Sequence, residues 1–319
     1  MSNFPDMVTQ FGGVPVGGSR YNGMWGGTVY FVDYDNGVSG AAGTKPTSAG
    51  KYLDDAIAAA GANDTIYIRP RPPEAGTTYY GGDPGDILPK TASTNYTISY
   101  LKYGLSIIGT GTGLGPAGAS RTCLQGDATI TSTPVFTVNA PYVTFENLGI
   151  KPGASTTGLI KQAFVDASAQ DAYANTYYNV WFRNVDAAAG YSLMLDGGSY
   201  DNVLNCTFSG HPTGIYLSGT TANNTATTIR NCDFDVAFAT VKCDIYSNGT
   251  VTRILVNRCN FNHTGPAGGA PNMFISFASA STGLISDCYM GHDDATIANS
   301  ITANGVTNAH VWGMTAEIT

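Results

Sequence analysis

Five side chains have types and spacings that could catalyse the cleavage of a glycan. Asp233 and Asp235 stand two residues apart in "NCDFD", so both carboxylates would point to one side of an extended strand. The segment "GHDD" brings together His292, Asp293 and Asp294. Two carboxylates about 5 to 9.5 Å apart can serve a glycoside hydrolase as acid and as base or nucleophile. The alternative for the first pair is a solvated face or a bound ion, and for the second group an ordinary polar turn.

Other kinds of chemistry find less support in the sequence. The six cysteines form no Cys-x-x-Cys pair, so no metal site is predicted. The stretch "GTGTGLG" lacks the lysine that a phosphate-binding loop requires, and no cofactor is expected. Aromatic side chains could instead bind a glycan by stacking, and the tyrosines that suit this role are Tyr79, Tyr80, Tyr177 and Tyr178.

A recurring segment must position these side chains. The stretches "VLNCTFS", "IRNCDFD" and "VNRCNFN" return to the same order of an apolar residue, a polar residue, Cys, a polar residue and Phe. Aligned on the cysteine, "VTFENLGI" places Leu148 there, "VWFRNVDA" places Val185, and "VWGMTAEI" places Met314. Apolar and polar residues alternate within each copy, which is the period of a strand with one buried face. Repeats of about 20 to 50 residues indicate solenoids, propellers or arrays.

One strand and a turn-rich stretch per copy predict the coil of a single-stranded parallel β-helix, hence an all-β fold. Equivalent residues then stack about 4.8 Å apart. We expect a core ladder of free thiols at Cys206, Cys232, Cys259 and Cys288, since buried cysteine packs as a small hydrophobe. The side chains two residues further on would form a second stack: Phe208, Phe234, Phe261 and Met290. A row of asparagines is expected beside the ladder, at Asn147, Asn184, Asn205 and Asn231.

The chain divides into three predicted parts. Residues 1–27 are apolar, aromatic and Gly-rich, and they are either a disordered terminus or an arm that docks to a partner through Phe4, Phe11, Tyr21 and Trp25. Residues 28–63 hold a strand and an amphipathic helix that covers the open end of the coils. Residues 64–319 form the β-helix, with excursions off the coil near 70–100 and 160–178.

Charge and hydropathy exclude several partners. Charged residues make up 12% of the chain, the net charge is −8, and the 15 Lys and Arg form no run. A nucleic-acid groove needs clustered positive charge, so none is predicted. No stretch approaches the length of a membrane span. The start "MSNFPDMVTQFGG" lacks the basic and apolar regions of a signal peptide, so synthesis in a cytoplasm is expected.

Three stretches carry a resemblance to a known family: "YFVDYDNG", "LDDAIAAAGANDTIYIRP", and the "NVxFxN" and "NCxF" coils. Together they resemble the right-handed parallel β-helix of the pectate-lyase-like group over about residues 28–319. With the Gly-rich arm, the chain looks most like the β-helix proteins of bacteriophage particles. The Asn-Thr-Asp and Gly-His-Gly pattern of polygalacturonases and the Arg-x-Pro-x-x-Arg pattern of the lyases are both missing.

Two functions follow from this resemblance. The first is a virion structural protein, a decoration or spike at the virion surface, made in the host cytoplasm, anchored by its arm and trimeric. Its partners would be its own copies, other virion proteins and host glycans. The alternative is a polysaccharide-degrading tailspike, a hydrolase or lyase. Between them stands a protein that binds a glycan without cleaving it.

Overall fold

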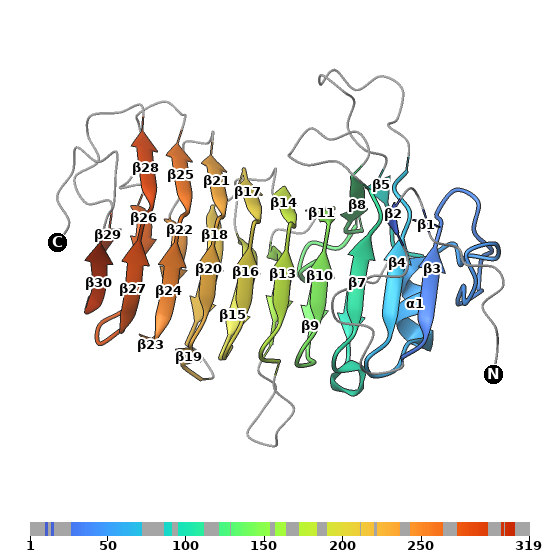
Figure 1. The fold of residues 1–319 in the computed structure, drawn as a ribbon, viewed down its shortest axis with the longest axis horizontal. Helices are drawn as coiled ribbons and strands as arrows, with labels where there is room; N and C mark the ends of the chain where they lie inside the picture. The colour runs from blue at the N-terminus through green and yellow to red at the C-terminus, as the bar shows by residue number, and fades with distance from the viewer. Residues whose placement is uncertain are drawn as a thin grey trace.

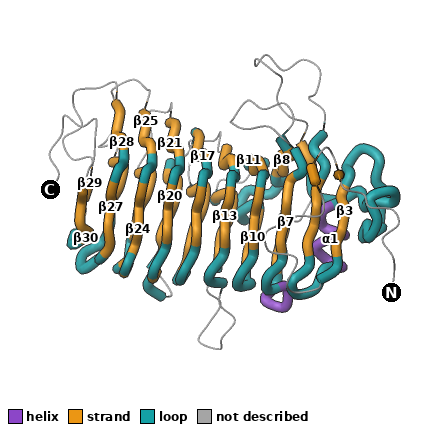
Figure 2. Tube along the Cα trace, viewed as in Figure 1, coloured by secondary structure: helices purple, strands orange, loops and turns teal. Residues whose placement is uncertain are grey.

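The chain winds into a parallel β-helix made of three sheets and one short helix (Figures 1 and 2). The computed structural model describes residues 10–11, 14–15, 27–71, 86–90, 95–111, 121–127, 129–153, 157–163, 172–183, 190–210, 212–219, 222–236, 243–263, 273–292, 301–302 and 304–309. Each full coil contributes one strand to each sheet, and every pairing between neighbouring coils is parallel. The all-β class and the parallel β-helix predicted from the repeat are therefore confirmed.

The ten-stranded sheet faces the viewer in Figure 1 and runs the length of the molecule. Its strands, from N- to C-terminus, are β3 (Val29–Val32), β4 (Thr65–Ile68), β7 (Ser106–Gly109), β10 (Thr144–Glu146), β13 (Thr176–Tyr178), β16 (Asn202–Leu204), β20 (Thr228–Arg230), β24 (Ile254–Asn257), β27 (Gly283–Ser286) and β30 (Val306–Ala309).

The other two sheets have eight strands each. The β5–β28 sheet contains β5 (Asp86–Ile87), β8 (Thr122–Gln125), β11 (Leu148–Lys151), β14 (Trp181–Arg183), β17 (Thr207–Ser209), β21 (Asp233–Val236), β25 (Asn260–His263) and β28 (Tyr289–His292). The β6–β29 sheet contains β6 (Tyr96–Ile98), β9 (Phe136–Val138), β12 (Gly158–Gln162), β15 (Tyr191–Asp196), β18 (Thr213–Ser218), β22 (Cys243–Ser247), β26 (Met273–Ser276) and β29 (Ile301–Thr302). Two short strands, β19 (Asn224–Thr225) and β23 (Val251–Thr252), pair at a turn.

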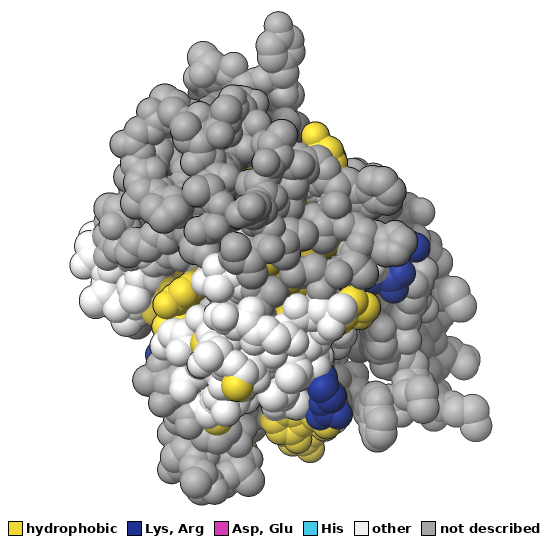
Figure 3. All heavy atoms as spheres, turned by 90° about the vertical axis from the view of Figure 1, so that its left-hand side faces the viewer, with side chains coloured by type: hydrophobic (Ala, Val, Ile, Leu, Met, Phe, Trp, Pro, Cys, Tyr) yellow, Lys and Arg dark blue, Asp and Glu magenta, His cyan; other side chains and the backbone are white. Residues whose placement is uncertain are grey.

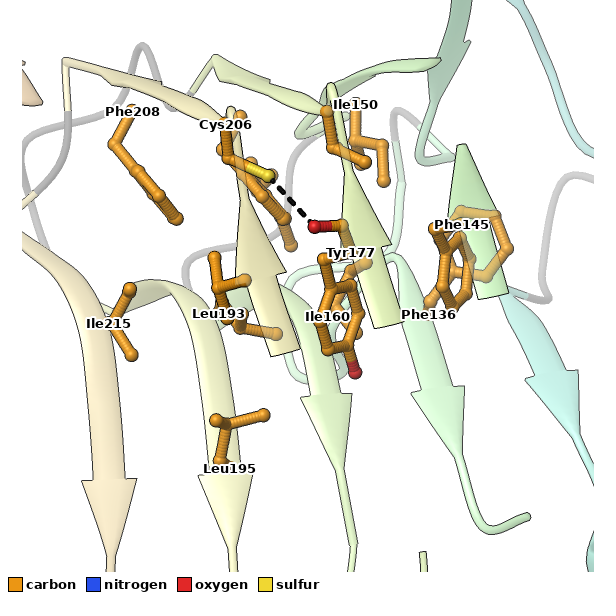
Figure 4. Packing of buried hydrophobic residues seen from close by; sticks show 14 of the residues in the cluster. Phe136, Phe145, Ile150, Ile160, Tyr177, Leu193, Leu195, Cys206, Phe208 and Ile215 are labelled. Carbon is orange, nitrogen blue, oxygen red and sulfur yellow. Dashed lines mark hydrogen bonds between the residues drawn. The ribbon is translucent and has the colours of Figure 1, made fainter. Parts of the chain in front are cut away.

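Like side chains stack inside the coils because the strands are parallel and in register. The rings of Phe182, Phe208, Phe234 and Phe261 form an aromatic column, in which the centres of neighbouring rings lie 4.6 to 4.8 Å apart and the ring planes are almost parallel. Figure 4 shows how residues from all three sheets meet in this core, among them Tyr177 from the ten-stranded sheet, Phe208 from the β5–β28 sheet and Leu193 from the β6–β29 sheet. The spacing equals the distance between neighbouring strands, so each ring packs on its copy in the next coil.

The cysteine column lies next to the aromatic column. Cys206, Cys232, Cys259 and Cys288 are free and buried, one in each of four successive coils. Each thiol donates a long hydrogen bond to a backbone carbonyl of the preceding coil, as Cys206 does to Tyr177 in Figure 4. The prediction that Val185 precedes them is wrong. Trp181 pairs with Thr207, so Val180 occupies the column instead.

Helix α1 (Leu53–Ala59) closes the N-terminal end of the coils. It lies between β3 and β4 in the chain, where later coils have strands of the two eight-stranded sheets. Its residues Leu53, Ala56 and Ile57 are buried and join the hydrophobic core. The hydroxyl of Tyr30 on β3 donates to the carbonyl of Ala59 at the end of the helix. The helix therefore covers apolar side chains that the first strands would otherwise expose.

Strands occupy part of both predicted excursions. Within 70–100, the structure places β5 and β6 on the first complete coil, and within 160–178 it places most of β12 and all of β13. Short strands flanked by Pro, Gly and Tyr hide the alternation on which the prediction relied. In the arm, Gln10–Phe11 (β1) and Val14–Pro15 (β2) pair as antiparallel strands. The side chains predicted to dock to a partner, those of Phe4, Phe11, Tyr21 and Trp25, lie outside the described residues.

Candidate functional site

An asparagine corner joins the ten-stranded sheet to the β5–β28 sheet. Asn147, Asn179, Asn205 and Asn231 occupy equivalent turn positions with φ between 52° and 56°, and Arg258 and Asp287 continue the column at 54°. Asparagine accepts this left-handed conformation more readily than most residues. Its amide then reaches the next coil: Nδ2 of Asn231 donates to Oδ1 of Asn205 at 3.1 Å, and Nδ2 of Asn179 donates to Oδ1 of Asn147 at 2.7 Å.

A shallow groove of about 440 Å³ lies along this corner on the outer face of the β5–β28 sheet. Amide and hydroxyl groups repeat along it from coil to coil, and its charged residues are Arg121, Asp233 and Asp235. Its lining residues are Arg121, Asn179, Asn205, Thr207, Asn231, Asp233, Phe234, Asp235, Asn260 and Asn262. Amides carry both donors and acceptors, so the groove offers both kinds of hydrogen bond at each step.

The two carboxylates predicted from the sequence lie in this groove. Asp233 and Asp235 are both exposed on β21, and their Cα atoms are roughly 6–7 Å apart because strands rise about 3.3 Å per residue. Partial burial, together with the charge of Asp235, raises the pKa of Asp233, although a hydrogen bond from Asn260 acts in the opposite direction. In register with the pair stand Thr207 and Ser209 on one side. The groove thus holds two neighbouring acids, and the pKa of Asp233 is raised.

A more basic and aromatic region continues the same face towards the N-terminus. The Trp181 indole donates to Oγ of Ser209 at 2.9 Å, and the Arg183 guanidinium lies 5.4 Å from the centre of its ring. Lys151 pairs with Asp86 at 2.8 Å. Gly149 makes room for this packing, since a Cβ there would stand 3.0 Å from the Cys123 sulfur and 3.4 Å from the indole.

The cysteines are unsuited to nucleophilic chemistry because the thiolate, and not the thiol, is the reactive form. Burial raises the pKa of Cys123 to about 12 and holds the pKa values of Cys232, Cys243 and Cys259 well above the ordinary range. In the described part of the chain no three His, Cys, Asp or Glu side chains are grouped to hold a metal ion. Among the same residues, no helix combines the length and apolarity of a membrane span.

The remaining predicted site residues do not lie in the groove or are not described by the structure. Tyr177 cannot stack on a glycan: it is fully buried, and its hydroxyl donates to Oε1 of Gln162. The correction follows from strand alternation, which turns Tyr177 inward and its neighbour Tyr178 outward, where it is exposed. Tyr79 and Tyr80 lie outside the described residues. His292 ends β28, but its side chain is not described, and neither are Asp293 and Asp294.

Sequence reasoning missed three residues at this site: Arg121, Asn179 and Trp181. The signal for Asn179 was present, because "NVWF" at 179–182 repeats the pattern of "NCTF" at 205–208. Asn184, which was assigned to the row instead, lies outside the described residues. Arg121 carries no such signal. It reaches the groove from a distant part of the chain, where its Nη2 donates to Oδ1 of Asn179 at 3.2 Å.

Solved structures with the same fold exist, whereas no protein-family model and no curated protein matches the sequence. Two crystal structures of pectin methylesterase from Aspergillus niger, which differ in deglycosylation, each superpose with a TM-score of 0.55 at 12% identity. The match covers 91% of this chain and 85% of the esterase. Pectate lyase Pel9A gives 0.48 at 14% identity, over 93% of this chain and 80% of the lyase. The protein thus has the right-handed parallel β-helix fold of pectin-modifying enzymes, and the likeness extends to the fold alone.

Proposed function

We propose that this protein is a rigid structural rod that holds an uncharged polysaccharide strand along its groove without cleaving it. The observation that carries the proposal is the repetition of the lining. Amide and hydroxyl side chains recur from coil to coil along the asparagine corner, and a repeating polymer needs equivalent hydrogen-bonding partners at regular intervals. Asp233 and Asp235 would repel a polyanion, so an uncharged glycan fits better.

The test is affinity gel electrophoresis of the full chain with laminarin and dextran as neutral probes and polygalacturonate as an acidic one. We expect retardation by at least one neutral probe. The double variant Asp235→Ala with Asn262→Ala should weaken it about tenfold, because it removes two neighbouring polar groups from adjacent strands. These side chains are exposed, so the fold should survive the change.

A matched control makes the same chemical change elsewhere. Asp35 and Asn36 are adjacent and exposed in the loop after β3, far along the chain from the groove. Asp35→Ala with Asn36→Ala removes the same groups and charge, and it should leave the retardation unchanged. The proposal fails if no neutral probe slows the protein, or if the groove variant and the control behave alike.

The raised pKa of Asp233 beside Asp235 favours one second candidate, a glycoside hydrolase. The acid with the raised pKa would protonate the leaving oxygen, and the other would activate water or form the glycosyl intermediate. The test is the release of new reducing ends from laminarin or dextran. If Asp233→Asn and Asp235→Asn each abolish this release, the protein is a glycoside hydrolase and not a non-catalytic rod. Release that survives both changes would instead point to a contaminant.

The place of the rod on a phage particle rests on the sequence resemblance. We propose that the arm anchors it through Phe4, Phe11, Tyr21 and Trp25, and that three copies associate at the virion surface. The aromatic composition of the arm supports this, since such side chains are costly to leave in water. A chain lacking residues 1–26 should keep its melting temperature but no longer co-purify with particles. Co-purification of that shortened chain would refute the anchoring role.

A further inference from the structure

A row of exposed tyrosines lies on the opposite margin of the ten-stranded sheet, where its strands begin. We call it the tyrosine ridge and define it as the exposed residues Tyr100, Tyr103, Tyr142 and Tyr200 together with the partly buried Tyr173, which packs against Tyr142. The side chains of Tyr142 and Tyr200 are 53% and 56% exposed, and Tyr103 is 48% exposed. Four exposed tyrosines along one margin exceed the scatter of single exposed apolar residues that any surface shows.

The coils place these rings in successive layers. Tyr142 and Tyr200 each stand two residues before a strand, ahead of β10 and β16, while Tyr103 stands three residues before β7. Backbone hydrogen bonds join the layers: the amide of Gly104 donates to Pro141, and that of Tyr142 donates to Tyr173. The ridge therefore follows the long axis of the molecule, with layers about 4.8 Å apart.

The backbone is strained at two of these positions. Tyr142 and Tyr200 have φ of 60° and 61°, the left-handed region that bulky side chains rarely adopt. Equivalent turns in other coils place Asn63, Gly104, Ala174, Ala226 and Arg253 there, also at positive φ. The left-handed conformation is therefore a property of the turn, and asparagine or glycine accepts it with less strain than tyrosine.

The tyrosine hydroxyls give the ridge a polar rim, and two of its rings contact each other. Tyr142 and Tyr173 meet edge to face, with ring centres 5.2 Å apart and hydroxyl oxygens 3.5 Å apart. At the far end the guanidinium of Arg253 lies 5.9 Å from the ring centre of Tyr200. Figure 3, which looks along the molecule from its C-terminal end, shows hydrophobic and basic side chains together at the lower margin of the described surface.

The exposed area and the chemistry of the ridge indicate which kind of ligand it would bind. A half-exposed tyrosine offers about 100 Å², so the four exposed tyrosines of the ridge offer about 400 Å². A stable protein interface needs about 800 Å² from each partner, which argues against a second copy. A sugar ring has an apolar face of C–H groups and a polar rim of hydroxyls. A tyrosine has an apolar ring and a hydroxyl, so a row of them can pack on sugar faces and bond sugar rims.

We propose that the tyrosine ridge is a second glycan-binding site, which stacks the rings of an uncharged oligosaccharide along the margin of the ten-stranded sheet. It is separate from the groove, which lies at the other end of the same strands. The site goes beyond the proposed function, because it binds by stacking and would persist if the groove bound nothing.

The experiment is affinity electrophoresis with laminarin, comparing the full chain with the variants Tyr142→Asn and Tyr200→Asn. Asparagine accepts the left-handed backbone at both positions, so the fold is retained and only the ring is lost. Each variant should raise the dissociation constant about tenfold. The binding that remains after the groove variant should persist between 0.05 and 0.5 M salt, because stacking involves no ion pair.

The matched control is Tyr246→Asn, which removes an exposed tyrosine from the β6–β29 sheet and touches neither the ridge nor the groove lining. It should leave binding unchanged. Equal weakening of binding by the control and by the ridge variants would overturn the inference. A loss of binding confined to the variant Asp235→Ala with Asn262→Ala would also overturn it and would support the groove as the only glycan site. A loss confined to the ridge variants would support the inference and reject the groove. Sedimentation that shows a self-association abolished by Tyr142→Asn would assign the ridge to a second copy instead.

Discussion

A single carboxyl group, Asp201, has the most perturbed setting inside the coils. It is fully buried, its Oδ1 accepts the amide of Asn175 at 2.9 Å, and its Oδ2 accepts Nε2 of Gln162 at 3.0 Å. Gln162 in turn accepts from Asn175 and Tyr177, so the network links three successive coils. No side-chain cation belongs to this network, and burial outweighs the two hydrogen bonds and raises the pKa of Asp201 to about 7.

The pH dependence of stability follows from this raised pKa. An unfolded aspartate titrates near 3.9, so the folded state binds more protons between about pH 4 and 7. The stabilisation by the protonated group is complete below about pH 4 and is lost as the pH rises through 7. In this window Asp201 should lower the free energy of unfolding by up to about 1.4 kcal/mol per pH unit. Urea unfolding across the window, in the wild type and in Asp201→Asn, measures it, and identical slopes would show that Asp201 does not titrate there.

At the scale of the structural element, the asparagine corner determines how each coil bends from one sheet into the next. Its residues combine a left-handed backbone with a side-chain bond to the next coil. In the last coils Arg258 and Asp287 keep the backbone conformation, so the turn is required even where the amide is replaced. The conformation is thus a property of the coil, and asparagine is the residue that satisfies it with least strain.

Replacing Asn231 should separate these two contributions. Asn231→Ala loses the side-chain hydrogen bond to Asn205 and leaves an alanine at φ near 53°. It should therefore destabilise the fold by about 1–2 kcal/mol. Asn231→Gly loses the bond but tolerates the backbone, so its cost should be smaller. Urea unfolding gives both values. Asn260→Ala, at an exposed strand position, is the control and should change little, and an equal cost for alanine and glycine would argue against backbone strain.

At the scale of the whole molecule, the fold is a stack in which each coil contacts only its neighbours. Such solenoids depend on their ends, because the terminal coil must cover apolar side chains that have no further coil to pack on. At the N-terminal end this cover is α1, which is held by Tyr30 and by Lys102, whose ammonium group donates to the carbonyls of Ala58 and Ala60. The groove and the tyrosine ridge lie along the stack, so both depend on its register.

Loss of a buried side chain from α1 should therefore affect the whole molecule. Leu53→Ala removes a fully buried side chain at the closed end and should destabilise the fold by about 2–5 kcal/mol. It should also promote aggregation, since the first strands become accessible to other chains. Thermal unfolding with light scattering measures both effects. Leu101→Ala, at a side chain that is 64% exposed, is the control, and equal melting temperatures for the two variants would mean that α1 is not needed as a cover.

The amino-acid sequence by itself determined the coil, its period and its core. Recurrence of Asn, Cys and Phe at Asn205, Cys206 and Phe208, and again one coil later, predicts parallel strands in register, because only stacked coils bring equal residues together. Only the tertiary structure decided which outward-facing side chains become neighbours on the surface. Arg121 and Asn179 meet across 58 residues, and Tyr142 joins Tyr173 across 31. Local patterns do not encode such meetings, because which outward side chains become neighbours depends on how many residues each turn inserts between strands.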